Sequence, residues 1–284
     1  MRTRILPKMT NDEVETYLDH NDLIFIPVGV IETHGCLPVN CETILPEAIA
    51  LKLAELSNGL CLTGLPYFYA GATLVGRGTV QVSIKTGTEY LHHLARSLLS
   101  QGFRRQVYIT FHGPAMLTVG PMIRDFFEET KAPILYIDGT AFLKVLTGSN
   151  NMIGTEELTD IFVGAYQIMG CLEDVPVNIP ESDSQIYGED PRKMSRGLDF
   201  AKNIFALGHG SGTVGYYFDR PAEHGNVMPI PTKENRAERA ERGAKMIEKM
   251  TAGVDILGVV ENLARLDRHI NEEVIPKRTN LGLK

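Results

Sequence analysis

The chain has 284 residues, of which 43% are hydrophobic and 22% are charged, and its formal net charge is −7. This composition is typical of a globular protein, and its length suits one large α/β domain over residues 1–284. The acidity and the absence of a dense Lys/Arg block argue against nucleic-acid binding, and no apolar stretch is long enough to cross a membrane. The N-terminus lacks the apolar run of a signal peptide, and four cysteines are too few for a disulfide scaffold. We therefore expect a cytoplasmic protein.

Helical and strand patterns alternate through the first half of the chain. Thr10 and Glu13 form the capping-box pattern that opens a helix over about residues 11–20. Short apolar runs predict buried parallel strands, and the amphipathic stretches between them predict helices. The predicted strands cover 23–28, 60–66, 106–111 and 133–138, and the predicted helices cover 43–59, 88–102 and 121–130. This alternation predicts a three-layer α/β/α fold with a mainly parallel central sheet and right-handed crossovers.

The pattern is less regular after Asp138. Residues 156–173 have a helical pattern, residues 176–195 are polar with Pro and Ser, and residues 234–250 form a charged amphipathic helix. No internal repeat, linker or low-complexity block marks a second domain, so we expect a single domain.

Metal-binding side chains follow two of the predicted strands. Glu32, His34 and Glu42 come after the first strand, and His112 comes directly after the strand at 106–111. Ligands of an open parallel sheet bind outside the carboxyl ends of its strands, so these side chains are expected at one edge. Carboxylate with imidazole suits zinc, manganese or iron better than calcium, which takes only oxygen ligands.

A loop-capping role for Glu32 and His34 is the alternative to a metal site. For an isolated Glu-x-His pattern we would favour that alternative. A second histidine, His112, at a second strand end favours a metal site instead.

Three segments resemble the creatininase (creatinine amidohydrolase) family. Residues 25–50, "FIPVGVIETHGCLPVNCETILPEAIA", are similar to the family pattern P-V-G-S-x-E-Q-H-G-P-H-L-P-L-x-T-D-T. Residues 76–84, "GRGTVQVSI", resemble its G-T-I-S-L segment, and residues 94–114 resemble its R-S-L block that ends in G-H-G. The resemblance covers about residues 20–130, in order and with suitable spacing.

The resemblance implies a metal-dependent hydrolase with a binuclear site on an α/β/α fold, commonly assembled as a homohexamer. By motif, Glu32, His34 and His112 match metal ligands of the family. Glu42 falls on the bridging Asp, with one residue fewer between it and His34 than in the family. The longer Glu side chain can make up that reach.

Several family positions carry different residues here. Pro114 stands where creatininase has a carboxylate. In the segment that matches the family's H-A-G-E-x-E-T-S, Phe162 replaces a His, and Ala165 and Gln167 replace two Glu. Phe cannot transfer a proton, and the chain has no Trp to close over a substrate ring. The binuclear mechanism therefore cannot be transferred intact.

Two loop histidines, His209 and His224, could replace the missing acid–base group, although a solvated loop histidine is the alternative. For Cys36 and Cys41, which flank the predicted site, packing is favoured over a ligand or reactive role. Candidates for a late carboxylate ligand are Asp160, Glu173 and Asp174.

The expected function is a metal-dependent hydrolase that opens a small cyclic substrate at an amide or related C–N bond, with creatinine itself excluded. Glu32 and His112 would serve one ion, which leaves only His34 and a shared Glu42 for another, so we expect one tightly bound Zn or Mn ion. The expected assembly is a homo-oligomer, most simply a hexamer. The alternatives are a carbon–carbon bond hydrolase acting on a cyclic polyol ketone (an oxidised inositol) and a non-catalytic family member acting as a binding subunit.

Overall fold

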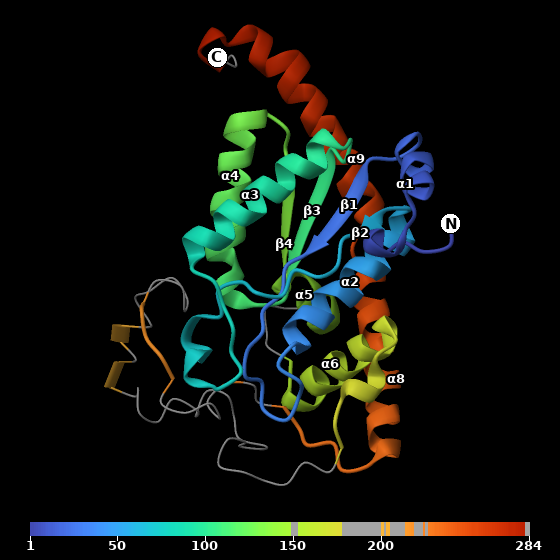
Figure 1. The fold of residues 1–284 in the computed structure, drawn as a ribbon, viewed down its shortest axis with the longest axis vertical. Helices are drawn as coiled ribbons and strands as arrows, with labels where there is room; N and C mark the ends of the chain where they lie inside the picture. The colour runs from blue at the N-terminus through green and yellow to red at the C-terminus, as the bar shows by residue number, and fades with distance from the viewer. Residues whose placement is uncertain are drawn as a thin grey trace.

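A parallel sheet forms the centre of the protein (Figure 1). The structure, a computed structural model, describes residues 1–148, 153–177, 200–201, 203–204, 214–218, 224 and 227–281. In these residues the sheet has the order β2-β1-β3-β4, and every neighbouring pair is parallel. The strands are β1 (Leu23–Pro27), β2 (Leu60–Cys61), β3 (Arg105–Thr110) and β4 (Leu135–Asp138).

Helices connect and cover these strands. They are α1 (Asn11–Leu18), α2 (Cys41–Ser57), α3 (Ile84–Ser100), α4 (Met116–Thr130), α5 (Thr140–Thr147), α6 (Thr155–Met169), α8 (Lys233–Ala252) and α9 (Ile256–Arg268). The predicted capping box at the start of α1 is confirmed, because Thr10 accepts from the Glu13 backbone and Glu13 accepts from the Thr10 backbone. The helices α5 and α9 were not predicted from the sequence.

Two predicted elements extend well past the end of the observed ones. The strand predicted at 60–66 ends at Cys61, because Gly64 has a φ of 94° and Pro66 follows. The helix predicted at 156–173 ends at Met169, where Gly170 adopts the left-handed C-cap conformation with a φ of 76°. The polar stretch predicted at 176–195 lies mostly outside the described residues.

Alternate residues of β1 face opposite sides of the sheet. Leu23 and Phe25 belong to the hydrophobic cluster formed with α2, α6, α8 and α9, whereas Ile24 and Ile26 belong to the cluster formed with α1, α3 and α4. Figure 1 shows α3 and α4 on one side of the sheet and α2, α6 and α8 on the other. The predicted three-layer α/β/α fold is confirmed.

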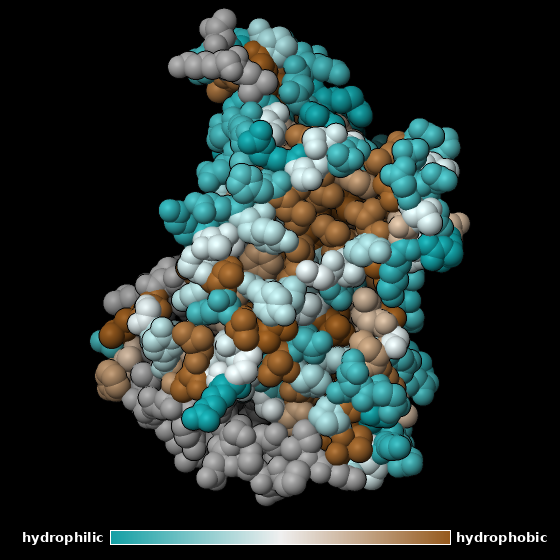
Figure 2. All heavy atoms as spheres, in the orientation of Figure 1, coloured by the Kyte–Doolittle hydropathy of each residue, from teal (hydrophilic) through white to brown (hydrophobic). Residues whose placement is uncertain are grey.

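Hydrophobic side chains gather on part of the surface. Figure 2 shows hydrophilic residues around the upper helices and brown, hydrophobic residues in the middle of the same face. Exposed large hydrophobic residues include Tyr67, Val80 and Tyr90, which are 55%, 51% and 53% exposed. A patch of gathered hydrophobic residues such as the brown one in Figure 2 is typical of surfaces that contact another molecule. Among the described helices, none is both long and apolar enough to span a membrane.

The helices α6 and α8 pack closely through two glycines. A Cβ atom on Gly243 of α8 would overlap the carbonyl oxygen of Asp160 in α6, and a Cβ on Gly164 would overlap the backbone at Gly243 and Ala244. The buried Asp160 carboxylate accepts from Arg239 and Arg242 of α8 at 2.7 Å each. Asp160 is therefore part of the helix contact, and the prediction that it could supply a late metal ligand is wrong.

Replacing Gly243 by Ala should strongly destabilise the fold, because the added methyl group forces α6 and α8 apart. We expect a loss of about 3 kcal/mol or more in the unfolding free energy, at the upper end of overpacking effects. Urea unfolding of Gly243→Ala measures this loss. Glu238→Ala, on the exposed side of the same helix, is the control and should change stability by less than about 0.5 kcal/mol. Equal stability of the two variants would contradict the close contact.

Candidate metal centre

The carboxyl ends of β1 and β3 carry three of the predicted ligands. Glu32 and His34 lie in the segment that leaves β1, and His112 follows β3 directly. The two strand ends lie side by side, because Pro27 pairs with Ile109. All three side chains are buried, with Glu32 at 0% and His112 at 4% exposure.

Glu42 reaches the same edge from the first turn of α2, where an acidic side chain suits the positive end of the helix dipole. Close packing brings this turn to the strand exit. A Cβ on Gly29 would lie 2.6 Å from Thr43 Cα, and the Thr43 hydroxyl donates to the Val30 carbonyl at 2.9 Å. A glycine is therefore required at position 29 for Glu42 to lie beside Glu32.

His112 lies between the two carboxylates. Its Nδ1 is 2.6 Å from Glu42 Oε2 and 3.1 Å from Glu32 Oε1. Its Nε2 lies 3.1 Å from the backbone carbonyl oxygen of Tyr69, to which it donates. This second bond holds the ring so that Nδ1 faces the carboxylates, an orientation typical of metal-binding histidines.

His34 has no hydrogen-bond partner for either ring nitrogen among the described residues, although its side chain is only 4% exposed. Its Nδ1 points toward Glu42 Oε1 at 3.9 Å, which is too long for a hydrogen bond. Burial lowers the pKa of His34 to about 3, so the ring is neutral and its lone pair is free to bind a cation. A buried imidazole without a partner is costly unless a ligand completes it.

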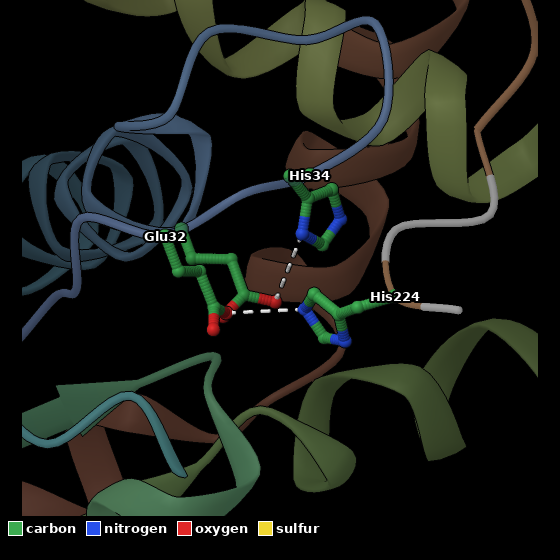
Figure 3. Close-up of side chains that lie close together, drawn as sticks. Glu32, His34 and His224 are labelled. Atoms are coloured by element: carbon green, nitrogen blue, oxygen red, sulfur yellow. Dashed lines mark hydrogen bonds and ion pairs between the residues drawn. The ribbon is translucent and has the colours of Figure 1, made fainter. Parts of the chain in front are cut away.

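His224 joins this cluster from a segment far along the chain. Its Nε2 is 3.2 Å from Glu32 Oε1, and its ring centroid lies 5.0 Å from that of His34. Figure 3 shows His34 and His224 on two different segments, with the His224 ring pointing toward Glu32. Donor atoms of Glu32, His34, Glu42 and His224 all lie within 4.8 Å of one another. Two carboxylates and two imidazoles in this arrangement fit a divalent zinc or manganese ion.

The charges of the cluster depend on one another. Burial and the nearby Glu32 carboxylate raise the pKa of Glu42 to about 7. Burial disfavours a charged His112, but Glu32 and Glu42 outweigh burial and raise the pKa of His112 to about 10. Burial also opposes ionisation of Glu32, yet His112 and His224 hold its pKa well below the usual value. In the metal-free protein, protonated imidazole therefore supplies the positive charge between the carboxylates.

One loop contributes contacts that were not predicted from the sequence. The Thr73 hydroxyl donates to Glu32 Oε2 at 2.5 Å, and Tyr69 supplies the carbonyl that orients His112. Thr73 lies in a short 3-10 helix, Gly71–Val75, which has no distinctive sequence pattern, and a backbone carbonyl leaves no trace in the sequence. Both could be found only from the structure.

Other predicted site residues have different outcomes. His209 lies outside the described residues. Cys36 and Cys41 are buried, and burial raises the pKa of Cys36 to about 11 and that of Cys41 well above its ordinary value. Both are therefore unreactive thiols, in agreement with a packing role. Glu173 pairs with Arg236, which removes it as a late ligand. Asp174 lies next to it in a short 3-10 helix and is not among the clustered donors.

The altered family positions lie around the cluster or away from it. Phe162 packs edge-on against His34, with ring centroids 4.7 Å apart. Pro114 lies close to Gly71 of the loop that carries Thr73. Ala165 is buried in the core, and Gln167 is exposed on the surface of α6. None of these residues supplies a metal ligand of the type that the family has at those positions.

Comparison with known proteins identifies the family. The family model described as creatininase, creatinine amidohydrolase, matches residues 7–162, which is more than half of the chain. The chain belongs to the creatininase family. Members of this family are metal-dependent hydrolases.

Two curated relatives match a part of the chain. The creatinine amidohydrolase of Pseudomonas putida is 30% identical over 112 residues, which cover 37% of this chain and 43% of the relative. The 3-dehydro-scyllo-inosose hydrolase of Thermotoga maritima is 28% identical over 132 residues, which cover 46% of this chain and 42% of the relative. The matched segments thus span less than half the length of these relatives.

Solved creatininase structures share the fold. A mutant creatininase described as Zn–Zn type has a TM-score of 0.54 at 18% identity, and covers 87% of this chain and 96% of its own. A structure described as "Creatininase Mn" has a TM-score of 0.52 at 18% identity with the same coverage. Identities this low establish the α/β fold of the family and no further detail.

Proposed function

We propose that this creatininase-family protein is a metal-dependent hydrolase that opens a small cyclic substrate at an amide or related C–N bond. The observation that carries the proposal is the buried His34 ring. It has no partner among the described residues, and it faces two carboxylates and a second imidazole. The relative from Pseudomonas putida, a creatinine amidohydrolase, supports C–N bond chemistry.

One ion would be held by His34, His224, Glu42 and Glu32, whose donor atoms already lie near one another. A second position would lie between His112 and the same two carboxylates. His112 keeps its proton there at neutral pH, because its pKa is raised to about 10. We therefore propose one tightly held zinc or manganese ion and a weaker second ion.

A divalent ion would polarise a substrate carbonyl and lower the pKa of a water molecule toward about 7. The protein residues have separate tasks. Thr73 holds Glu32, Tyr69 orients His112, and Phe162 excludes water from one side of His34. His224 is assigned to the metal in this proposal, which leaves His209 as the proposed acid–base group.

A carbon–carbon bond hydrolase acting on a cyclic polyol ketone is the second candidate. The match to the 3-dehydro-scyllo-inosose hydrolase of Thermotoga maritima favours it, at nearly the same identity as the first relative. Opening a ketone ring requires the same polarised carbonyl and activated water, so the metal centre fits both reactions.

The proposal is tested by metal analysis and by hydrolysis assays on the dialysed protein. We expect about one equivalent of zinc or manganese per chain and turnover of a cyclic amide or cyclic polyol ketone that stops after chelation and returns with the metal. A chain that keeps no metal would instead be the non-catalytic binding subunit. A chain that is active without metal would also contradict the proposal.

Creatinine should not be a substrate. The chain has no Trp to close over the ring, and Phe162 replaces the proton-carrying histidine of the family. Loss of general acid–base help typically lowers a rate by about 10²–10⁴-fold when no other group, such as the proposed His209, replaces it for that substrate. Assay of creatine formation by the zinc- or manganese-loaded protein measures this. A rate comparable to that of a creatininase measured in parallel would show that another residue moves the proton.

A homo-oligomer is proposed for the assembly, with a hexamer expected from the family resemblance. The exposed Tyr67, Val80 and Tyr90 provide apolar surface that a subunit contact could cover. Light scattering at micromolar concentration should therefore give a mass several times that of the chain. A monomeric mass would contradict this expectation, and the cytoplasmic location stays a prediction.

A further inference from the structure

His224 is the metal-centre residue most remote in sequence from the others, since 192 positions separate it from Glu32. Its side chain is partly exposed at 25%, so burial alone does not fix its position. Described segments on both sides of it, residues 214–218 and 227–230, are attached to the rest of the fold. These attachments decide whether the imidazole stays near Glu32.

The segment after His224 is attached to α6. The backbone N–H of Met228 donates to the Thr159 hydroxyl at 2.8 Å, and this hydroxyl donates to the Thr155 carbonyl at 2.7 Å. Thr159 is fully buried, so its hydroxyl is the acceptor that satisfies a backbone N–H shielded from water. The Cys36 thiol also donates to the Met228 carbonyl at 3.4 Å. Position 228 is thus fixed four residues after His224.

The segment before His224 is attached to the loop that carries Thr73. The backbone N–H of Phe218 donates to the Ala72 carbonyl at 3.2 Å. The Phe218 ring then stacks on the His224 ring, with centroids 5.8 Å apart and planes 25° apart. Tyr216 packs edge-on against the Phe218 ring, with centroids 5.7 Å apart. The stacked ring limits the rotation of the imidazole.

We infer that Thr159 and Phe218 are positioning residues that hold His224 in the metal centre, one from each side along the chain. The inference rests on the proposed function, in which His224 binds the metal. Without either contact, His224 lies beside Glu32 in a smaller fraction of the molecules. The apparent metal affinity falls by the fraction of molecules that remain competent to bind.

The test compares Thr159→Val and Phe218→Leu with Thr159→Ser and Phe218→Tyr. The first pair removes the hydroxyl acceptor and the aromatic stack, whereas the second pair keeps them. Zn²⁺ affinity is measured by competition with a chromophoric chelator, and the visible spectrum of the Co²⁺-loaded protein reports the coordination number and geometry, which change if His224 is lost from the ion. We expect about 10–100-fold weaker Zn²⁺ binding in the first pair, the range typical of residues that orient metal ligands. The second pair should bind as the unmodified protein does.

A His224→Ala background separates positioning from general damage. In that background Thr159→Val and Phe218→Leu should cause no further loss of Zn²⁺ affinity, because the residue that they hold is gone. The same loss in both backgrounds would overturn the inference. Urea unfolding of the metal-free variants shows whether Thr159→Val still folds. Phe218→Leu changes a half-buried site, so it tests the positioning inference even if Thr159→Val does not fold.

The two proposals can fail separately. If His224→Ala weakens Zn²⁺ binding but Thr159→Val and Phe218→Leu do not, the positioning inference is overturned and the metal centre stands. If His224→Ala itself leaves Zn²⁺ binding unchanged, the ligand assignment in the proposed function is wrong and the inference falls with it.

Discussion

Replacing His34 by Leu is expected to remove the tightly bound metal while making the metal-free protein more stable. The His34 imidazole is buried, neutral and without a hydrogen-bond partner among the described residues. Each unsatisfied buried polar group costs about 1–3 kcal/mol. An apolar side chain of similar size avoids this cost, so the unfolding free energy of metal-free His34→Leu should rise by about 1–3 kcal/mol.

The same substitution removes one imidazole from the four donors around the tight position. The loss of Zn²⁺ affinity should exceed the roughly 10–100-fold effect of residues that only orient ligands. Urea unfolding in chelator gives the stability, and chelator competition gives the affinity. His93→Ala, at an exposed position of α3, is the control and should change neither quantity.

A His34→Leu protein that is more stable without metal but binds Zn²⁺ more weakly would show that His34 serves metal binding and not packing. A histidine kept for packing would give a less stable His34→Leu protein with unchanged metal binding. That result would remove the central support of the proposed function.

The second ion should bind more tightly as the pH rises. His112 carries a proton up to about pH 10 in the metal-free protein, because Glu32 and Glu42 raise its pKa against the opposing effect of burial. An ion between His112 and the two carboxylates must displace that proton. Its affinity should therefore rise about tenfold per pH unit, or about 100-fold between pH 7 and pH 9, and level off above pH 10.

Metal titrations at pH 7, 8 and 9 should show the stoichiometry rising from about one to two ions per chain. Calorimetry in buffers of different ionisation enthalpy counts the protons released. His112→Asn is the control. The Asn amide does not titrate, so binding of the second ion to this variant should release one proton fewer. Equal affinity for the second ion at pH 7 and pH 9 would show that His112 is already unprotonated.

Most of the fold could be predicted because its elements have strong local patterns. The apolar runs of β1 and β3 and the amphipathic pattern of α3 specify buried strands and a surface helix without tertiary information. The helix α5 was missed because an eight-residue apolar segment after a strand is ambiguous in type. The helix α9 could have been found, since Asp255 caps its start and its hydrophobic residues recur with helical spacing.

The sequence could predict the positions of site residues only where they closely follow strands of the parallel sheet. Glu32, His34 and His112 follow parallel strands, and parallel strands end at one edge, so their proximity follows from the sheet order. Glu42 required the resemblance to a family pattern. His224 could be selected as a loop histidine, but no strand places it near Glu32. Its contact depends on tertiary attachments at Thr159 and Ala72 that carry no local pattern.

The distance in sequence between His224 and Glu32 also bears on how the protein folds during synthesis. When the first 162 residues have left the ribosome, Glu32, His34, Glu42 and His112 are all present, whereas His224 is not. Bringing His224 to them closes a loop of 192 positions. Such long-range contacts form late, because the chain loses the entropy of loop closure before the contacts contribute any favourable energy. The parallel sheet can therefore assemble before the tight metal position is complete. With the proposed ligand set, metal capture would then be a late step of maturation that follows the attachments of the His224 segment to Thr159 and Ala72.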